Sequence, residues 1–109
     1  MLDNLRPWDV YTLRTAETLD QYANVHWPRH ISSLGKHGIT THGIWTEHSD
    51  DSHRLIALVS YQPDADIEQV ARDFMASAEF TSDMAGFDMQ NFTSVDTVLL
   101  ETTASSPLR

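Results

Sequence analysis

The sequence predicts an α+β fold of the ferredoxin-like type, a four-stranded antiparallel sheet with two helices on one face, in the order β-α-β-β-α-β. The first observation is residues 53–62, HRLIALVSYQ, whose two strand faces would both be apolar, as in a central strand covered on both sides. The second is that two amphipathic helical segments separate segments rich in strand-forming residues. Because the helices can cover only one face, we expect a homodimer through the sheet faces, in which the two sheets form a barrel-like enclosure.

The first half of the chain supplies a strand, a long helical segment and a second strand. Residues 8–15 alternate and are rich in β-formers. The helical segment after Thr15 is interrupted by Pro28, which predicts a kink or a new helical start. Residues 39–48 form the second strand, with a bulge or a close approach at Gly43. The apolar stripe of the helical segment comprises Leu19, Ala23, Trp27, His30 and Leu34.

The second half of the chain supplies the central strand, a second helix and the last strand. Residues 49–52 are a hairpin loop, and the central strand ends at Pro63. Asp66 and Gln69 have capping-box spacing, and the apolar pattern that follows predicts a second helix running on irregularly to Gly86. Residues 92–101 are the last strand, and residues 102–109 are a polar tail.

Length and composition restrict the class of protein. The 109 residues suffice for one domain, 1–109, with a single core. Sixteen acidic against seven basic residues give a net charge of −9, which argues against nucleic-acid and membrane-surface partners. Without cysteine the chain has no disulfides or thiolate chemistry, which is compatible with a cytoplasmic location. No apolar run approaches the length of a membrane span.

Short motifs spread from residue 11 to residue 100 have a characteristic order and spacing. They are Tyr11-Thr-Leu-Arg14, His26-Trp27-Pro28, His37-Gly38, Gly43-Ile44-Trp45 and Val98-Leu99-Leu100. Together they resemble the NIPSNAP-like family. The resemblance implies a dimeric α+β barrel, in agreement with the strand pattern, but no particular reaction. Similar folds serve cofactor-free monooxygenases, polyketide cyclases, lactone isomerases and haem enzymes, and the fold does not decide among them.

Six histidines are the main candidates for chemistry. His26 and His30 have the spacing of metal ligands, but the pattern lacks the glutamate of an HExxH motif and Pro28 interrupts it, so we assign no metal site. Within the apolar stripe, His30 either faces a pocket or is a hydrogen-bonded core residue. His26 is either partly exposed or in contact with a ligand.

The remaining candidates come from the predicted strands and the aromatic residues. His42 shares a strand face with Ile44 and would project into a pocket. Arg14 would bind a carboxylate or enolate, or form a rim salt bridge. Tyr61 would donate a proton, or lie in the core with its hydroxyl satisfied. Trp27 and Trp45 would line a pocket for an aromatic ligand, or simply fill the core.

Two hypotheses about function follow. The first is a cofactor-independent enzyme of cyclase, isomerase or monooxygenase type, acting on a hydrophobic, aromatic or polyketide-like metabolite. The second is a non-catalytic small-molecule-binding or protein-interaction module. In the first, the catalytic residues are His30, His42, Arg14 and Tyr61, and the ligand-binding residues are Trp27, Trp45 and His26.

Overall fold

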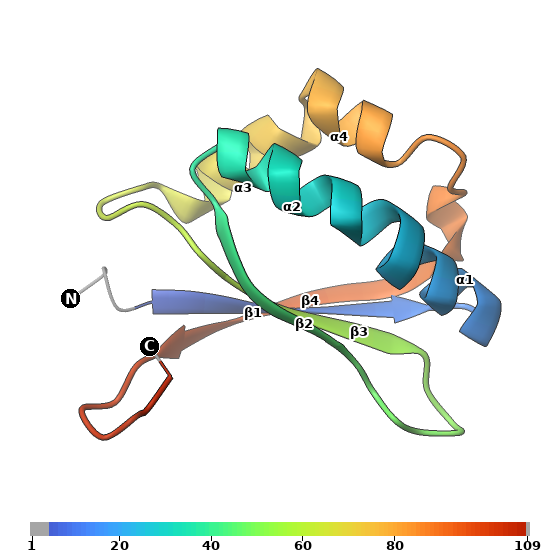
Figure 1. Cartoon of the computed structure of the whole chain (residues 1–109), viewed down its shortest axis with the longest axis horizontal. Helices are drawn as coiled ribbons and strands as arrows, with labels where there is room; N and C mark the ends of the chain where they lie inside the picture. Colours follow the sequence, from blue (N-terminus) through green and yellow to red (C-terminus); the bar gives the residue numbers. More distant parts are fainter. Residues whose placement is uncertain (1–4, 109) are drawn as a thin grey trace.

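The computed structural model describes residues 5–108 and shows a sheet covered by helices on one face (Figure 1). The four strands lie in the order β2-β3-β1-β4, and all neighbours are antiparallel. This confirms the ferredoxin-like α+β fold. The elements are β1 (Leu5–Leu13), α1 (Ala16–Gln21), η2 (Tyr22–His26), α2 (Trp27–Lys36), β2 (Thr40–Thr46), β3 (Arg54–Ser60), α3 (Ile67–Met75), α4 (Ala78–Asp83), η3 (Met89–Asn91) and β4 (Phe92–Glu101).

The first helical segment is three helices in succession. A reciprocal capping box between Thr15 and Thr18 begins α1. The π-helical turn η2 follows and buries both of its end residues, Tyr22 and His26. Pro28 lies in the first turn of α2, directly after the π-helical turn, so the expected new helical start occurs here.

The second helical segment breaks where the sequence pattern predicted continuity. Asp66 caps α3 by accepting a hydrogen bond from the backbone N–H of Gln69. The helix ends at Met75, and the Ser77 side chain caps a separate helix, α4. The prediction of one irregular helix was therefore wrong, because a second N-cap begins a separate helix, α4, which packs on α2.

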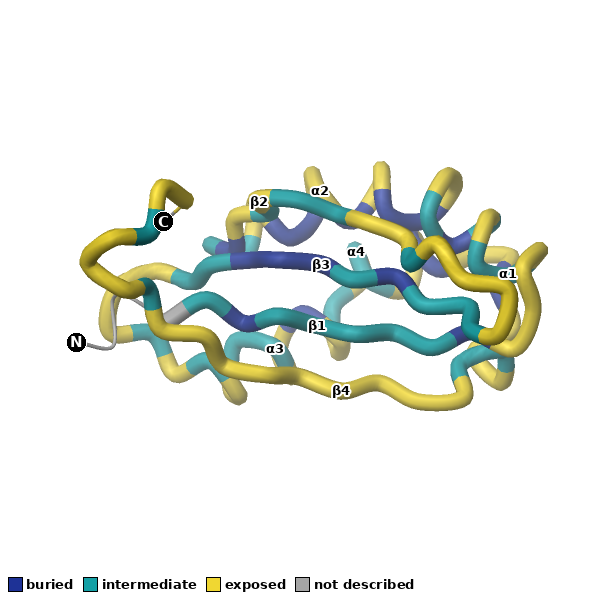
Figure 2. The backbone as a smooth tube through the Cα atoms, turned by 90° about the horizontal axis from the view of Figure 1, so that it is seen from below, coloured by how far each residue is buried: buried dark blue, intermediate teal, exposed yellow. Residues whose placement is uncertain are grey.

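The helix-facing side of the sheet forms the core. Leu55, Ala57 and Val59 of β3 are buried there, and the register places Tyr11 opposite Leu55 on β1. Figure 2 shows the two central strands mostly buried or half-buried, whereas β4 is exposed along nearly its whole length. The edge strand β4 therefore leaves one side of the space under the helices open.

The opposite face of the sheet is not covered by the helices. Trp8 and Trp45 stack across it with ring centroids 5.9 Å apart. The Trp45 indole lies directly over Gly43, so close that a Cβ there would collide with it. On this face Val98 is 50% exposed and Trp45 46% exposed. We call this apolar surface, made by Trp8, Trp45, Val98 and Leu100, the open face.

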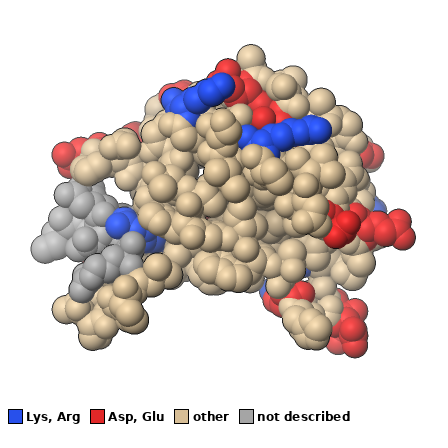
Figure 3. Space-filling view, in the orientation of Figure 1, with Lys and Arg blue, Asp and Glu red and all other residues tan. Residues whose placement is uncertain are grey.

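The charged residues lie mainly toward the periphery in the view of Figure 3, and the middle of that view is uncharged. Among residues 5–108, no helix combines the length and the apolar character needed to cross a membrane.

Candidate functional site

A cavity of about 640 Å³ lies between the helix-facing side of the sheet and helices α2, α3 and α4. Its volume is in the range of pockets that hold drug-sized ligands. The polar groups on its wall are few and come from separate elements: Asp9, Tyr11, Tyr22, Trp27, His30, Tyr61, Glu68 and Thr97.

The mouth of the cavity is apolar and lies along β4. Four large apolar residues that line the cavity are also exposed to solvent, between 47% and 61%. They are Met75 on α3, Met89 in η3, and Val95 and Leu99 on β4. Exposed apolar side chains around an opening are typical of a binding site, and the flexible methionines can adapt to what enters.

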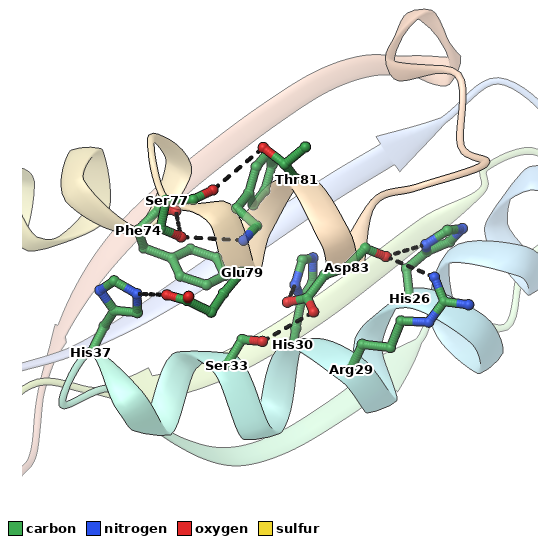
Figure 4. Close-up of polar contacts among 11 residues, drawn as sticks. His26, Arg29, His30, Ser33, His37, Phe74, Ser77, Glu79, Thr81 and Asp83 are labelled. Atoms are coloured by element: carbon green, nitrogen blue, oxygen red, sulfur yellow. Dashed lines mark hydrogen bonds and ion pairs between the residues drawn. The ribbon is translucent and has the colours of Figure 1, made fainter.

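His30 and Asp83 form a buried pair between α2 and α4 (Figure 4). The Nδ1–H of His30 donates to Oδ2 of Asp83 at 2.9 Å, and the Ser33 hydroxyl donates to Oδ1 at 3.0 Å. Among residues 5–108, Nε2 of His30 makes no hydrogen bond, and the residue lines the cavity. With a proton on Nδ1, Nε2 carries a lone pair and is the atom available to a ligand.

The backbone carbonyl of Asp83 also accepts hydrogen bonds from the helical segment. Its carbonyl accepts a hydrogen bond from Nδ1–H of His26 at 2.7 Å and another from Arg29 at 3.1 Å. Asp83 is the last residue of α4, where the helix dipole disfavours a carboxylate, so these donors and His30 offset an unfavourable position. The donors recur along one side of the helical segment at residues 26, 29, 30 and 33, a helical spacing that faces α4.

Burial and Asp83 shift the pKa of His30 in opposite directions. Burial lowers the pKa of His30 below its ordinary value, and the hydrogen bond and charge of Asp83 partly restore it. The imidazole is therefore neutral at pH 7, as a general base must be. It is packed among four aromatic rings, of which Phe80 is stacked on it at 5.8 Å.

A second titratable group, Asp9, lies on the sheet side of the cavity. Its carboxylate accepts one hydrogen bond, from the Thr97 hydroxyl at 2.7 Å. Burial raises the pKa of Asp9, and this hydrogen bond opposes the rise. Burial together with the charge of Asp9 raises the pKa of Tyr61 to about 12, and also raises the pKa values of Tyr11 and Tyr22. All three phenols therefore stay protonated and can donate hydrogen bonds.

Trp27 adds a donor to this wall. The residue is 2% exposed and lines the cavity, and its buried indole N–H interacts with the Tyr22 hydroxyl without forming a hydrogen bond of good geometry among residues 5–108. A buried polar group without a partner costs free energy unless a ligand or a water molecule satisfies it.

The structure brings together three of the residues that the sequence singled out. His30, Tyr61 and Trp27 all line the cavity. His26 does not: it is 1% exposed, and Gln21 and the Asp83 carbonyl occupy its two ring nitrogens. The expectation that His26 is partly exposed was therefore wrong.

Arg14 lies beyond the end of β1, where its guanidinium donates to the backbone carbonyl of Gln90 at 2.8 Å. It is exposed and outside the cavity, and among residues 5–108 it forms no salt bridge. Its role in holding an enolate therefore has no geometric support.

His42 and Trp45 lie on the far side of the sheet from the cavity. A register shift between Thr41 and Gly43 makes His42 the bulged residue, and its Nε2 is 2.7 Å from the Ser60 hydroxyl on the open face. The expectation that His42 shares a face with Ile44 was wrong, because the extra residue of the bulge reverses the alternation. Trp45 covers Gly43 on the open face and lines no part of the cavity.

Four residues of the site did not stand out in the sequence. Asp9 and Tyr11 share a strand face with buried Leu13. An acidic residue on a strand face that points into the core could therefore have been recognised from the sequence as a candidate site residue. Thr97 lies opposite Asp9 in the pairing of β1 with β4, so its part in the site depends on the strand register. Asp83 reaches His30 across 53 residues of sequence, and local spacing contains no signal of that contact.

No protein-family model matches the sequence, and no curated protein matches it either. Solved structures do. A dimeric ferredoxin-like protein from an uncultured marine organism superposes with a TM-score of 0.62 and 12% identity, over 96% of this chain and 99% of that one. A Nitrosomonas europaea protein provisionally named an antibiotic biosynthesis monooxygenase gives a TM-score of 0.61 and 12% identity, over 95% of both chains. The class defined by these matches is the ferredoxin-like α+β fold.

Within that class the similarity to NIPSNAP proteins is greater. A NIPSNAP family protein of unknown function from Agrobacterium tumefaciens superposes with a TM-score of 0.77 and 13% identity, over 96% of this chain and 93% of that one. The chain therefore has the NIPSNAP fold, and the resemblance read from the sequence motifs is confirmed at the level of the fold.

Proposed function

We propose that the protein is a small enzyme that binds an apolar molecule in the helix-side cavity and moves a proton on it without a cofactor. The observation that carries the proposal is the His30–Asp83 pair. Asp83 fixes the proton on Nδ1, and Nε2 of the same ring is left without a hydrogen bond at the wall of the cavity. A neutral imidazole with a defined tautomer, held by a carboxylate in a residue that lines the cavity, is suited to act as a general base.

The surrounding groups suit proton transfer on a hydrophobic, ring-containing substrate. Most of the wall is apolar or aromatic, which excludes water and packs against rings. The hydroxyl of Tyr61 and the poorly satisfied N–H of Trp27 are donors for a carbonyl or hydroxyl oxygen of the substrate. Arg14, His42 and Trp45 have no part in this proposal, because they lie outside the cavity.

The experiment uses exchange of acidic C–H protons, which needs no knowledge of the natural substrate. The protein is incubated in D₂O with 2-tetralone, and deuterium incorporation next to the carbonyl is followed by NMR. We expect exchange faster than in buffer, loss of that rate in His30→Gln, and retention in His42→Gln, the matched control on the open face. A wild-type rate equal to buffer, or an unchanged rate in His30→Gln, contradicts the proposal.

A non-catalytic binding module is the second candidate. The observation that favours it is the aromatic packing on His30, which also suits a structural histidine. Saturable binding of 2-tetralone without accelerated exchange would favour this candidate.

For the assembly, we propose a homodimer through the open face. Its exposed apolar residues provide the surface, and one structural neighbour is named as dimeric. The cytoplasmic location expected from the sequence stays a prediction, which fractionation of a tagged protein would test.

A further inference from the structure

The charges around the cavity have one sign. Two of its described lining residues, Asp9 and Glu68, carry carboxyl groups, and none is lysine or arginine. An anionic ligand would meet negative charge without a compensating cation, which disfavours carboxylates, phosphates and fatty acids.

Asp9 has unused capacity for a partner. An ionised carboxylate offers about four acceptor positions. Thr97 occupies one of them, and no other described residue donates to Asp9 or forms a salt bridge with it. Asp9 is half-buried, and withdrawing a charge from water costs free energy unless a counter-ion binds it.

Aromatic rings surround the same part of the cavity. Tyr11 and Tyr22 lie 5.4 Å apart between centroids, and Phe92 lies 4.9 Å from Tyr22. The face of an aromatic ring attracts an ammonium group, and it does so more strongly where water is excluded. A carboxylate beside aromatic rings is therefore suited to a positively charged nitrogen.

A hollow beside the cavity is also lined by negative charge and by no described positive charge. A smaller hollow of about 250 Å³ adjoins the cavity and shares Tyr61, Ile67 and Glu68 with it. This hollow adds Asp64 and Asp66, and its described lining contains no lysine or arginine. With a net charge of −9 on the chain, the hollow attracts cations and repels anions.

We propose that the cavity selects ligands with a basic nitrogen on an apolar body, and that the Asp9 carboxylate is the counter-ion of that nitrogen. The inference rests on the proposed function only in placing the ligand in this cavity. It adds the chemical class, an apolar amine, and a binding residue that the proton-transfer proposal does not use. The apolar body would lie along the aromatic and methionine-lined wall, with the nitrogen at the sheet.

The test compares three probes of nearly equal shape: 1-naphthylmethylamine, 1-naphthylmethanol and 1-naphthylacetate. Their affinities are measured by calorimetry at pH 7 with the wild type, Asp9→Asn and Asp96→Asn. Asp96→Asn removes the same charge from the opposite face of β4 and is the matched control. We expect the amine to bind about tenfold more tightly than the alcohol, and the carboxylate to bind most weakly. Asp9→Asn should remove the preference for the amine, and Asp96→Asn should keep it.

The possible failures separate the two proposals. If amine and alcohol bind equally well, or if Asp9→Asn keeps the preference, the inference about the amine is overturned while the cavity remains a binding site. If none of the three probes binds, the cavity is not a ligand site, and both the proposed function and this inference are overturned.

Discussion

Replacing Asp83 tests whether the carboxylate holds His30 in its working state. The Asp83 side chain accepts hydrogen bonds from His30 at 2.9 Å and from Ser33 at 3.0 Å, and the residue is 6% exposed. A hydrogen bond to a charged group contributes about 1.5–3 kcal/mol, so Asp83→Ala should lower the free energy of unfolding by about 3–6 kcal/mol. The hydrogen bonds of His26 and Arg29 go to the backbone carbonyl and survive the change.

The conservative variant Asp83→Asn removes the charge of the side chain and keeps its shape, so it separates the two contributions. Its amide can accept from His30 and donate to Ser33, so the loss of stability should be only about 1–2 kcal/mol. Because Asp83 opposes the lowering of the His30 pKa, removing its charge should lower that pKa further.

Two assays measure these effects. Urea unfolding gives the change in stability, and an NMR titration of the histidine Hε1 resonances gives the direction of the pKa change. The matched control is Glu79→Gln, since Glu79 is 2.9 Å from Nε2 of His37 in a pair with a 37% exposed carboxylate. Such a pair contributes about 1 kcal/mol or less, so the control should be nearly neutral. An unchanged or higher His30 pKa in Asp83→Asn would refute the role given to Asp83.

Three further outcomes follow from the same contacts. Because burial lowers the His30 pKa, the unfolded chain takes up a proton first as the pH falls below about 6.5, which destabilises the fold. His30→Gln should therefore lose less stability than the wild type between pH 7 and pH 5 in urea titrations, and an equal loss would contradict the assignment. The pH dependence contributed by Asp9 has the opposite direction. Its pKa is raised, so keeping it ionised costs stability at neutral pH. Asp9→Asn should raise Tm at pH 7, with a gain that fades as the pH falls toward about 3; a lower Tm at pH 7 would mean that the Asp9 charge is already compensated. On the open face, Trp45→Asp should turn the proposed dimer into a monomer in light scattering, and a wild-type mass identical to that of the variant would remove the case for this interface.

The fold could be predicted because its signals are local. Residues 53–62 were predicted to be a central strand from their apolar residues, and β3 is a central strand that buries Leu55, Ala57 and Val59 under the helices; the predicted last strand, 92–101, coincides with β4. The bulge or close approach expected at Gly43 is a close approach of the Trp45 indole, and the bulge itself lies one residue earlier, at His42. This single-residue offset explains the main error on β2, since it moves His42 to the open face.

The site was predictable only in part, for a physical reason. His30, Trp27 and Tyr61 could be selected because each places a functional group on an apolar stripe or strand. The partner that gives His30 its tautomer, Asp83, arrives through the separate helix α4, whose start at Ser77 the apolar periodicity did not reveal. Contacts between distant elements depend on how helices cross, and spacing along the chain does not encode that.

The most direct test of the central claim asks which histidine senses a ligand. In a protein with ¹³C-labelled histidine, the neutral probe 1-naphthylmethanol is added while all histidine Hε1 signals are observed. His30 lines the cavity and His42 lies on the open face, so the two report on opposite sides of the sheet. We expect a saturable shift of the His30 signal and a stationary His42 signal. A shift of His42 with a stationary His30 would place the binding site on the open face and overturn the assignment of the site to the cavity.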